Sequence, residues 1–490
     1  MRTFLDTLTD VFRGLRLGKE QRGLVLQSIV VGLAAWAVVF VLKELVHWLL
    51  QSVLQWIESA PTPAVLFLPL LVGAALVAIV AGVRPASIDY TDEDGQLKSL
   101  DAVEGDGLER AIALYHSSNP LGKEGGVGPE GLQARWHLPV ILLAARKFAA
   151  TLATLGSGGS GGLEASAALI GENLGAAYYR LRAEGTHPDG LRHSLFRPWT
   201  APNSEHLQVA QLSGVAAAVT ALIGAPVAAA FFATEVMYRN RPLLDKFFYS
   251  LISALVARVL SSLVTGARPM LFDVPFIEEP PADVGYLVFL VLTAVVIAAV
   301  GQVFRLLRLA SIAWFERRLG NRWARLLLGA AITGLIAYGV VVLTRPFVPV
   351  DIGLRLVLAS GESAINMAFA GQLTLTVALI GLMAKVLATL ATISSGGSAG
   401  LLVPSLFFGT MVATIFAKLG GLPETVLIVP ALTASLVAVV NTPLAALLLA
   451  IELFGSSYVV PAVLALLIAY LLSNPRTIYR TQKEHEEGKT

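Results

Sequence analysis

Long apolar blocks, separated by short polar stretches, fill most of the chain. The block from Gly23 to Leu42 is interrupted only by Gln27 and Ser28, and the block from Ala64 to Val83 contains no ionisable side chain. An α-helix rises about 1.5 Å per residue, so about 20 apolar residues cross the ~30 Å hydrocarbon core of a bilayer. Each of these two blocks therefore predicts a membrane-spanning helix.

The later apolar blocks are uneven in length, which indicates broken and tilted helices rather than a simple series of hairpins. We expect further spans near 207–237, 247–265, 286–304, 326–343, 372–393, 401–417, 424–439 and 441–472. Polar loops are expected at about 180–206, 238–246 and 305–325. A polar insertion from Arg84 to about Arg135 is too short for a domain, and within it Gly105–Leu114 predicts a turn that starts a helix.

One stretch of the chain occurs as two similar copies. KFAATLATLGSGGSGGLEASAALIG, from Lys147 to Gly171, aligns without a gap with KVLATLATISSGGSAGLLVPSLFFG, from Lys385 to Gly409, at an offset of 238 (385 − 147). Each copy predicts an apolar helix, a turn of small residues and a second helix. The first amides of a restarted helix are free donors at its positive end, and they bind anions. Two such breaks at corresponding positions predict an anion site between two repeats.

Glu164 is the only acid in this duplicated stretch, and it stands where the first copy restarts its helix. An ionisable group at membrane depth is a functional-site hypothesis by default. Its carboxylate could occupy the place of the transported anion and leave when protonated or displaced. The second copy has Leu402 at the matching position. The alternative is a capping carboxylate that only stabilises the start of the helix.

A second repeat supports the first. Glu235 and Glu452 each lie nine residues after a proline, Pro226 or Pro443, within an apolar segment. Two interpretations stay open for these acids: a role in transport, or a structural carboxylate that accepts hydrogen bonds from a neighbouring helix end or serine.

Lys147 and Lys385 start the two copies of the duplicated stretch. Their charge could draw anions toward the site, or their side chains could extend to a membrane interface. We favour the second interpretation.

Composition and charge agree with a membrane protein. Hydrophobic residues make up 55% of the 490 residues and charged residues 14%, which is typical of membrane proteins. The net charge of +2 argues against a nucleic-acid partner, and a chain without cysteine forms no disulfide or cysteine metal site. The segments before Gly23 and after Leu472 and the predicted 305–325 loop are basic, whereas the 51–63 loop has no Lys or Arg. Both termini are therefore expected in the cytoplasm.

Two enzymatic interpretations of the glycine run fail. A phosphate-binding loop would need a Lys-Ser or Lys-Thr pair, which the run lacks. An intramembrane serine protease would need a histidine on a neighbouring helix, but the seven histidines fall in loops, the tail or the ends of spans. We therefore expect no catalytic residue, no metal and no cofactor, only a bound anion.

Three motifs, in order, resemble those of the CLC family of chloride channels and proton/chloride exchangers, over about residues 20–480. Gly162-Leu163-Glu164-Ala165-Ser166 stands where the family has Gly-Lys/Arg-Glu-Gly-Pro. Gly400-Leu401-Leu402-Val403-Pro404 stands where it has Gly-Ile/x-Phe-x-Pro, and Tyr479 falls where the family's pore tyrosine lies. The resemblance is to prokaryotic-type members without CBS domains.

This resemblance implies an all-α integral membrane protein of CLC-type fold, with two inverted-topology repeats of broken, tilted helices. It also implies a homodimer with one anion path per subunit, in the cell (inner) membrane. With the hydropathy pattern, it gives a cytoplasmic N-terminal helix at 1–22, a transmembrane domain at 23–475 with repeats at about 64–265 and 286–472, and a cytoplasmic tail at 476–490.

The resemblance also assigns roles to residues. It makes Glu164 the gate and proton carrier. It places the anion against backbone amides and the pore tyrosine, at Leu163, Glu164, Ala165, Leu401, Leu402, Val403 and Tyr479.

The chain departs from the family pattern at three places. Asp106 best matches the pore serine of the family's Gly-Ser-Gly-Ile-Pro turn, and Ser117 is the alternative. An anionic side chain beside an anion is unfavourable at low dielectric unless it is protonated or turned away. Val236 occupies the position of the internal proton-transfer glutamate of many exchangers. Leu163 and Ser166 replace the basic residue and the proline of the gate motif.

Because valine cannot relay a proton, the sequence favours passive, channel-like conduction of chloride or a similar small anion. The alternative is proton-coupled exchange, with Asp106 in place of the missing internal acid. A membrane protein that binds an anion without moving it is a third possibility.

Overall fold

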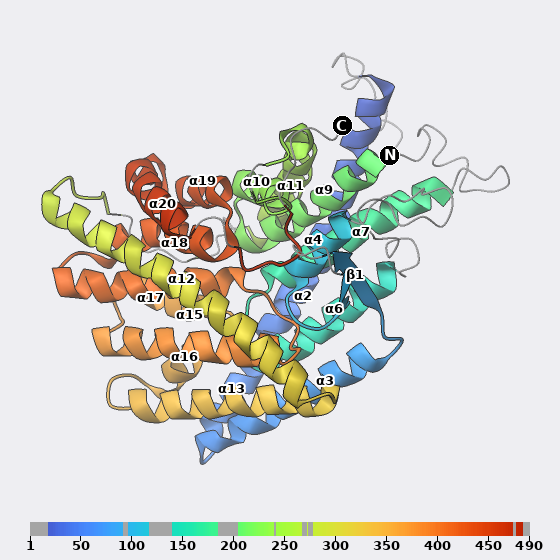
Figure 1. Ribbon diagram of the computed structural model, residues 1–490. Coiled ribbons are helices and arrows are strands. Elements are labelled where there is room, and N and C mark those ends of the chain that lie inside the picture. The colour runs from blue at the N-terminus through green and yellow to red at the C-terminus, as the bar shows by residue number, and fades with distance from the viewer. Residues whose placement is uncertain are drawn as a thin grey trace.

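The computed structural model describes residues 18–91, 97–116, 140–184, 204–239, 242–266, 272, 278–473 and 477–483. Most of this part of the chain is helical, and nine of its helices are long and apolar enough to cross a membrane. The expected fold of broken membrane helices is confirmed. In Figure 1 the first half of the chain, drawn blue to green, lies beside the second half, drawn yellow to red.

The helices of the first half are α2 (Lys19–Ser59), the 3₁₀ helix η1 (Pro63–Leu66), α3 (Phe67–Gly82), α4 (Gly107–His116), α6 (Val140–Gly156), α7 (Glu164–Glu184), α9 (Ser204–Ile223), α10 (Pro226–Glu235) and α11 (Leu244–Thr265).

The helices of the second half are α12 (Val284–Arg318), α13 (Arg322–Thr344), α14 (Val350–Arg355), α15 (Glu362–Phe369), α16 (Leu375–Ser394), α17 (Leu402–Gly420), α18 (Glu424–Val440), α19 (Pro443–Phe454), the 3₁₀ helix η2 (Ser456–Tyr458) and α20 (Val459–Ser473).

The two longest predicted spans are each broken in two. The 207–237 block divides into α9 and α10 at Gly224, and the 441–472 block divides into α19 and α20 at Gly455; both glycines have positive φ. Pro226 and Pro443 then start α10 and α19 at the first helical position, where a proline costs no hydrogen bond.

The prediction of a polar loop at 305–325 is wrong for most of these residues. The helix α12 continues to Arg318, and α13 begins at Arg322. Leu306, Leu307 and Leu309 keep this end of α12 apolar on its outer face. Arg308 points the other way and is buried, so a basic sequence here marks an internal ion pair as well as a polar surface.

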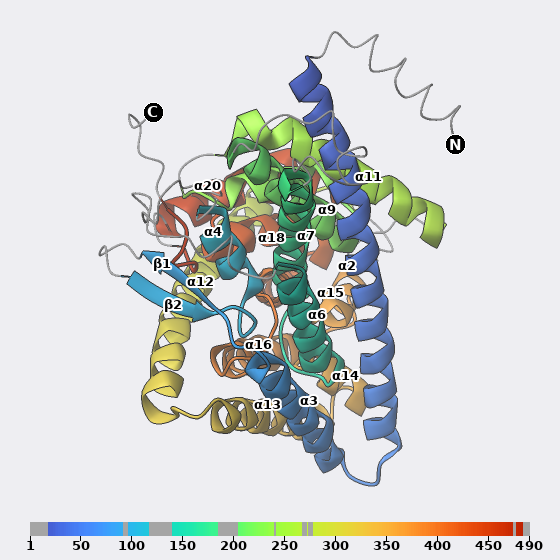
Figure 2. The same cartoon turned by 90° about the vertical axis from the view of Figure 1, so that its right-hand side faces the viewer.

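The predicted polar insertion contains a β-hairpin that the hydropathy pattern did not predict. Strand β1 (Ser87–Thr91) pairs antiparallel with β2 (Leu97–Asp101). The expected turn and helix follow as α4, whose Leu108 to Tyr115 are buried. Figure 2 shows the hairpin projecting on one side of the molecule, with α2 on the other.

Near both ends of the described chain, the structured part extends beyond the limits expected for the transmembrane domain. The first residues of α2, Lys19 to Arg22, fall inside the range expected for a separate N-terminal helix, and residues 1–17 lie outside the described part. At the other end, Ile478 and Tyr479 are buried. Residues 477–483 are therefore packed against the protein, although 476–490 was expected to be a tail.

Helix α13 defines two sides of the molecule. It begins at Arg322, whose guanidinium lies 2.6 Å from the carboxylate of Asp101 in the hairpin. We call this the hairpin side. It ends at Thr344, next to Gly353 of α14, and there Arg355 donates a 3.2 Å hydrogen bond to Gln51 near the end of α2. We call this the far side.

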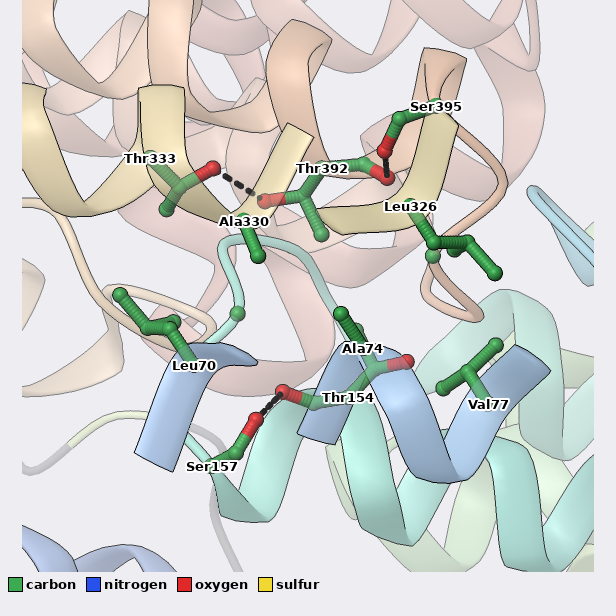
Figure 3. A pocket seen from close by; sticks show the side chains of 12 residues that line it. Leu70, Ala74, Val77, Thr154, Ser157, Leu326, Ala330, Thr333, Thr392 and Ser395 are labelled. Carbon is green, nitrogen blue, oxygen red and sulfur yellow. Dashed lines mark hydrogen bonds between the residues drawn. The ribbon is translucent and has the colours of Figure 1, made fainter. Parts of the chain in front are cut away.

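A small cavity of about 30 Å³ lies between the two duplicated turns (Figure 3). Residues of the two copies at the same offset of 238 line it. Ser157 Oγ donates to Thr154 O and Ser395 Oγ donates to Thr392 O, both at 3.0 Å. None of the described residues that line the cavity is titratable, so we assign it to packing between the repeats rather than to ion binding.

Candidate anion site

The duplicated turns meet through their main chains. The amide of Gly162 donates to Gly400 O at 2.8 Å, and the amide of Gly400 donates to Gly162 O at 2.7 Å. A Cβ atom on Gly400 would lie 2.6 Å from that of Ala165, so this approach requires glycine. The freed backbone groups of one turn thus find partners in the other, as irregular backbone at membrane depth requires.

Side chains of the two copies exchange hydrogen bonds in the same symmetric way. Ser160 Oγ lies 3.1 Å from Thr389 Oγ1, and Ser398 Oγ lies 2.9 Å from Thr151 Oγ1. These two pairs interchange under the offset of 238. The repeat found in the sequence is therefore a pseudo-two-fold arrangement that brings two helix starts together.

Glu164 is the first residue of α7 and is fully buried. The backbone amides of Glu164 itself and of Val403, in the first turn of α17, act on its carboxylate. Neither carboxylate oxygen makes a hydrogen bond of standard geometry with the described residues. The side chain therefore lies where the starts of α7 and α17 could hold an anion.

The other predicted backbone positions surround Glu164. Leu163, Ala165, Leu401, Leu402 and Val403 are all buried at the starts of α7 and α17. The start of α4 joins them, because a Cβ atom on Gly107 would collide with the Ala165 carbonyl. Three helix starts thus converge on one place.

Asp106 precedes α4 and is fully buried. Its Oδ1 accepts a 2.8 Å hydrogen bond from the amide of Leu108, whereas Oδ2 has no hydrogen-bond partner among the described residues. Burial raises the pKa of Asp106 above its ordinary value, and the positive charge of Arg308 acts against this shift. The alternative, Ser117, lies outside the described residues.

Tyr479 is buried beside these acids. Its hydroxyl has no hydrogen-bond partner among the described residues, and both Asp106 and Glu164 act on it electrostatically. The segment that carries it is held in place, since Gln482 Nε2 donates a 2.9 Å hydrogen bond to Val236 O. The structure thus brings Asp106, Glu164 and Tyr479 into one region.

A buried ion pair that the sequence did not reveal supports this region. Arg308 Nη2 lies 2.9 Å from Glu109 Oε2, and both side chains are at most 3% exposed. Burial alone would raise the pKa of Glu109, but Arg308 and then Arg480 lower it to about 2. Thr481 Oγ1 donates a 2.8 Å hydrogen bond to Glu109 O. The pair therefore joins α4, α12 and the segment that carries Tyr479.

A polar cavity of about 240 Å³ reaches Asp106 from the hairpin side. Glu104, Arg110, Ser394 and Arg480 are among its lining residues. Ser394 Oγ, like Asp106 Oδ2, has no hydrogen-bond partner among the described residues. The cavity is large enough for several water molecules with polar partners.

The predicted interfacial placement of the two lysines is wrong. Lys147 and Lys385 are fully buried. Lys147 Nζ donates to the carbonyls of Val103 and Gly105 at 3.0 and 2.8 Å, and Lys385 Nζ donates to two carbonyls of the turn 357–359. Each ammonium thus fixes the turn that precedes a short helix, α4 or α15, because a buried charge needs such partners.

The two repeated glutamates cap helices, as the structural interpretation predicted. The carboxylate of Glu235 accepts hydrogen bonds of 3.0 and 2.9 Å from the first amides of α19. The carboxylate of Glu452 accepts bonds of 3.3 and 3.0 Å from the first amides of α10. Val236, next to Glu235, is buried and offers no group that binds a proton.

Comparison with known proteins decides the family. The family model described as "Voltage gated chloride channel" matches residues 138–474, which is more than half of the chain. The chain belongs to the voltage gated chloride channel (CLC) family. It is thus a multi-pass membrane protein of an anion-transport family, as the three motifs predicted.

Relatives of this CLC protein include the H(+)/Cl(-) exchange transporter ClcA of Salmonella agona (strain SL483). It is 28% identical over 400 residues, which cover 77% of this chain and 74% of ClcA. ClcA of Salmonella typhimurium (strain LT2) gives the same identity and coverage. These relatives are named as transporters rather than enzymes.

Solved structures share the fold of this CLC protein. A CLC-type fluoride/proton antiporter matches with a TM-score of 0.69 at 21% identity, covering 95% of this chain and 98% of that one. A slow cyanobacterial Cl-/H+ antiporter also matches with a TM-score of 0.69, at 19% identity, covering 93% and 96%. The predicted CLC-type fold is confirmed.

Proposed function

We propose that this protein exchanges chloride, or a similar small anion, for protons. Glu164 is the gate and proton carrier, and Asp106 is the acid that takes up protons on the hairpin side. One observation carries the proposal: two buried carboxylates, Glu164 and Asp106, have oxygens without hydrogen-bond partners among the described residues, where three helix starts converge. The names of the relatives, which are exchange transporters, support coupling.

The anion part of the proposal rests on the free donors of the site. The starts of α7 and α17 present amides and positive helix-dipole ends toward the Glu164 carboxylate. Tyr479 adds a hydroxyl without a hydrogen-bond partner among the described residues. A carboxylate beside such donors is a natural stand-in for a monovalent anion, which takes its place when Glu164 is protonated and moves away.

The proton part rests on Asp106. This acid lines the 240 Å³ polar cavity, has a raised pKa and keeps one oxygen free. Water in the cavity can bring protons to it from the hairpin side. When Asp106 is protonated it no longer repels an anion at the site, which removes the cost expected of an acid at the position of the pore serine.

Passive conduction was the first expectation from the sequence, because Val236 replaces the usual internal acid. The relatives do not support it, since they are named exchangers. Asp106 offers another place for a proton, so the valine does not exclude coupling. Ion flux in vesicles also separates both transport mechanisms from binding without transport.

The orientation and the assembly remain part of the proposal. Arg318, Arg322 and Arg325 lie near the hairpin side, whereas residues 51–63, which are the end of α2 and the connection to η1 on the far side, include no Lys or Arg. The positive-inside rule then places the hairpin side and both termini in the cytoplasm. A homodimer follows from family membership alone.

The proposal is tested with purified protein in chloride-loaded vesicles, in which chloride efflux and external pH are recorded together. Asp106→Asn should lower the proton-to-chloride ratio at least tenfold while chloride still moves, because the amide carries no exchangeable acid. Glu164→Gln should abolish proton movement. Glu316→Gln is the matched control, since Glu316 lines the same cavity but is exposed. An unchanged ratio in Asp106→Asn would show that Asp106 is not the relay.

A further inference from the structure

The far side of the protein carries an acid to which the proposed function gives no role. Glu362 is the first residue of α15 and is half-buried. Its amide lies 3.5 Å from Ser360 Oγ, and the preceding Gly361 adopts a positive φ of 90°. This sharp turn starts α15.

Hydrogen bonds tie this turn to the gate. The carbonyl of Ala359, three residues before Glu362, accepts a 3.0 Å bond from the amide of Gly161, three residues before Glu164. Lys385 fixes the same turn from α16. A Cβ atom on Gly361 would lie 2.7 Å from the ring of Phe407 in α17, so the turn also packs against the helix whose start lies at Glu164.

The turn before α15 repeats the turn before α4. Lys147 holds the turn 103–105 and Lys385 holds the turn 357–359, and the two lysines correspond under the offset of 238. Each turn leads into a short helix and is followed by an acid: Asp106 comes directly after Gly105, and Glu362 comes three residues after Ala359. The gate thus has one acid on the hairpin side and one on the far side.

The charged groups that face Glu362 come from three further elements. Lys43 and His47 lie one turn apart on α2, and Lys385 lies on α16; all three act electrostatically on Glu362. Arg355 of α14 lies 3.5 Å from Ser363 Oγ. Figure 2 shows α14 beside α2, in agreement with their contacts. His47 is exposed and Lys43 is half-buried.

We propose that Glu362 is the acid through which protons pass between Glu164 and the solution on the far side. One proton leaves the Glu164 carboxyl for the Glu362 carboxylate, and then passes to water. No other bond forms or breaks. The turns that lead to the two acids are joined by the hydrogen bond from the Gly161 amide to the Ala359 carbonyl, which places the start of α15 beside the gate. This inference rests on the proposed function.

The test compares Glu362→Gln with wild type in the vesicle assay of coupled chloride and proton flux. Proton flux should fall at least tenfold, while chloride flux stays within about threefold of wild type. Asp351→Asn is the matched control, because Asp351 also lies in the first turn of a short helix, α14, on the far side. It should leave both fluxes unchanged. If Glu362→Gln does not fold, Glu362→Asp should show a proton-to-chloride ratio below that of wild type but above zero, because aspartate keeps the carboxyl group on a shorter side chain.

Each other outcome overturns the inference in a distinguishable way. If wild type couples and Glu362→Gln keeps the wild-type ratio, the relay is wrong and the proposed function stands. The same holds if both fluxes of the variant fall together, because that result indicates a structural role. If wild type moves chloride without protons, the proposed function and the relay fall together.

Discussion

Two acids three residues apart show how local contacts decide what a buried carboxylate does. Glu109 has Arg308 at 2.9 Å and is held in the charged state, with a pKa of about 2. Asp106 keeps one oxygen without a hydrogen-bond partner among the described residues, and its pKa is raised. Glu109 therefore stabilises the structure, whereas Asp106 is available to bind and release a proton.

The ion pair of Glu109 predicts a pH-dependent contribution to stability. The pKa of Glu109 is about 2 in the folded protein, against an ordinary value of 4.5. Such a difference corresponds to roughly 3 kcal/mol. Because the folded-state pKa is lowered, this stability is present above about pH 4.5 and is lost as the pH falls toward 2. Glu109→Gln should therefore destabilise the protein by about 3 kcal/mol at pH 7, and by less at pH 4.

Thermal unfolding in detergent measures this difference. The exposed acid Glu316 provides the control, since Glu316→Gln should leave the melting temperature unchanged. A Glu109→Gln variant that melts like wild type at pH 7 would contradict the assigned role of the pair.

At the scale of elements, α10 and α19 each take a cap from the other. Glu235 near the end of α10 binds the start of α19, and Glu452 near the end of α19 binds the start of α10. Each carboxylate satisfies amides that a helix start leaves free and lies at the positive end of the helix dipole. The pair explains why both repeats keep an acid nine residues after the proline.

This reciprocal capping predicts that Glu235 and Glu452 act in stability and not in coupling. Glu235→Gln and Glu452→Gln should each destabilise the protein by about 1–2 kcal/mol, because a charge-assisted cap is lost. Both should keep the wild-type proton-to-chloride ratio. Loss of coupling in Glu235→Gln alone would instead assign that acid to the proton path.

Much of the element structure could be predicted from the sequence. The apolar blocks, the breaks before Pro226 and Pro443 and the duplicated turns follow from local composition and spacing. The β-hairpin and the buried ends of Lys147 and Arg308 do not. Arg308 pairs with Glu109, which is 199 residues away in the sequence. From hydropathy alone, a basic residue at this position predicts an exposed polar loop. The periodicity of apolar residues gives no information about which residues far apart in the sequence form pairs.

At the scale of the whole molecule, two inverted halves give each side of the gate the same device. A buried lysine fixes a turn, the turn leads into a short helix, and an acid stands where the two join. Asp106, Glu164 and Glu362 form the proposed proton path from the hairpin side to the far side. The amides at the starts of α7 and α17 form the proposed anion site in its middle.

The most direct test of this account is the flux of the wild-type protein. Purified protein in chloride-loaded vesicles is followed with a chloride electrode and a pH electrode, with and without a potassium ionophore. We expect proton uptake into the vesicles to track chloride efflux at a fixed ratio, and a proton gradient alone to drive chloride against its own gradient. Chloride efflux that needs the ionophore and moves no protons would contradict the account and establish passive conduction.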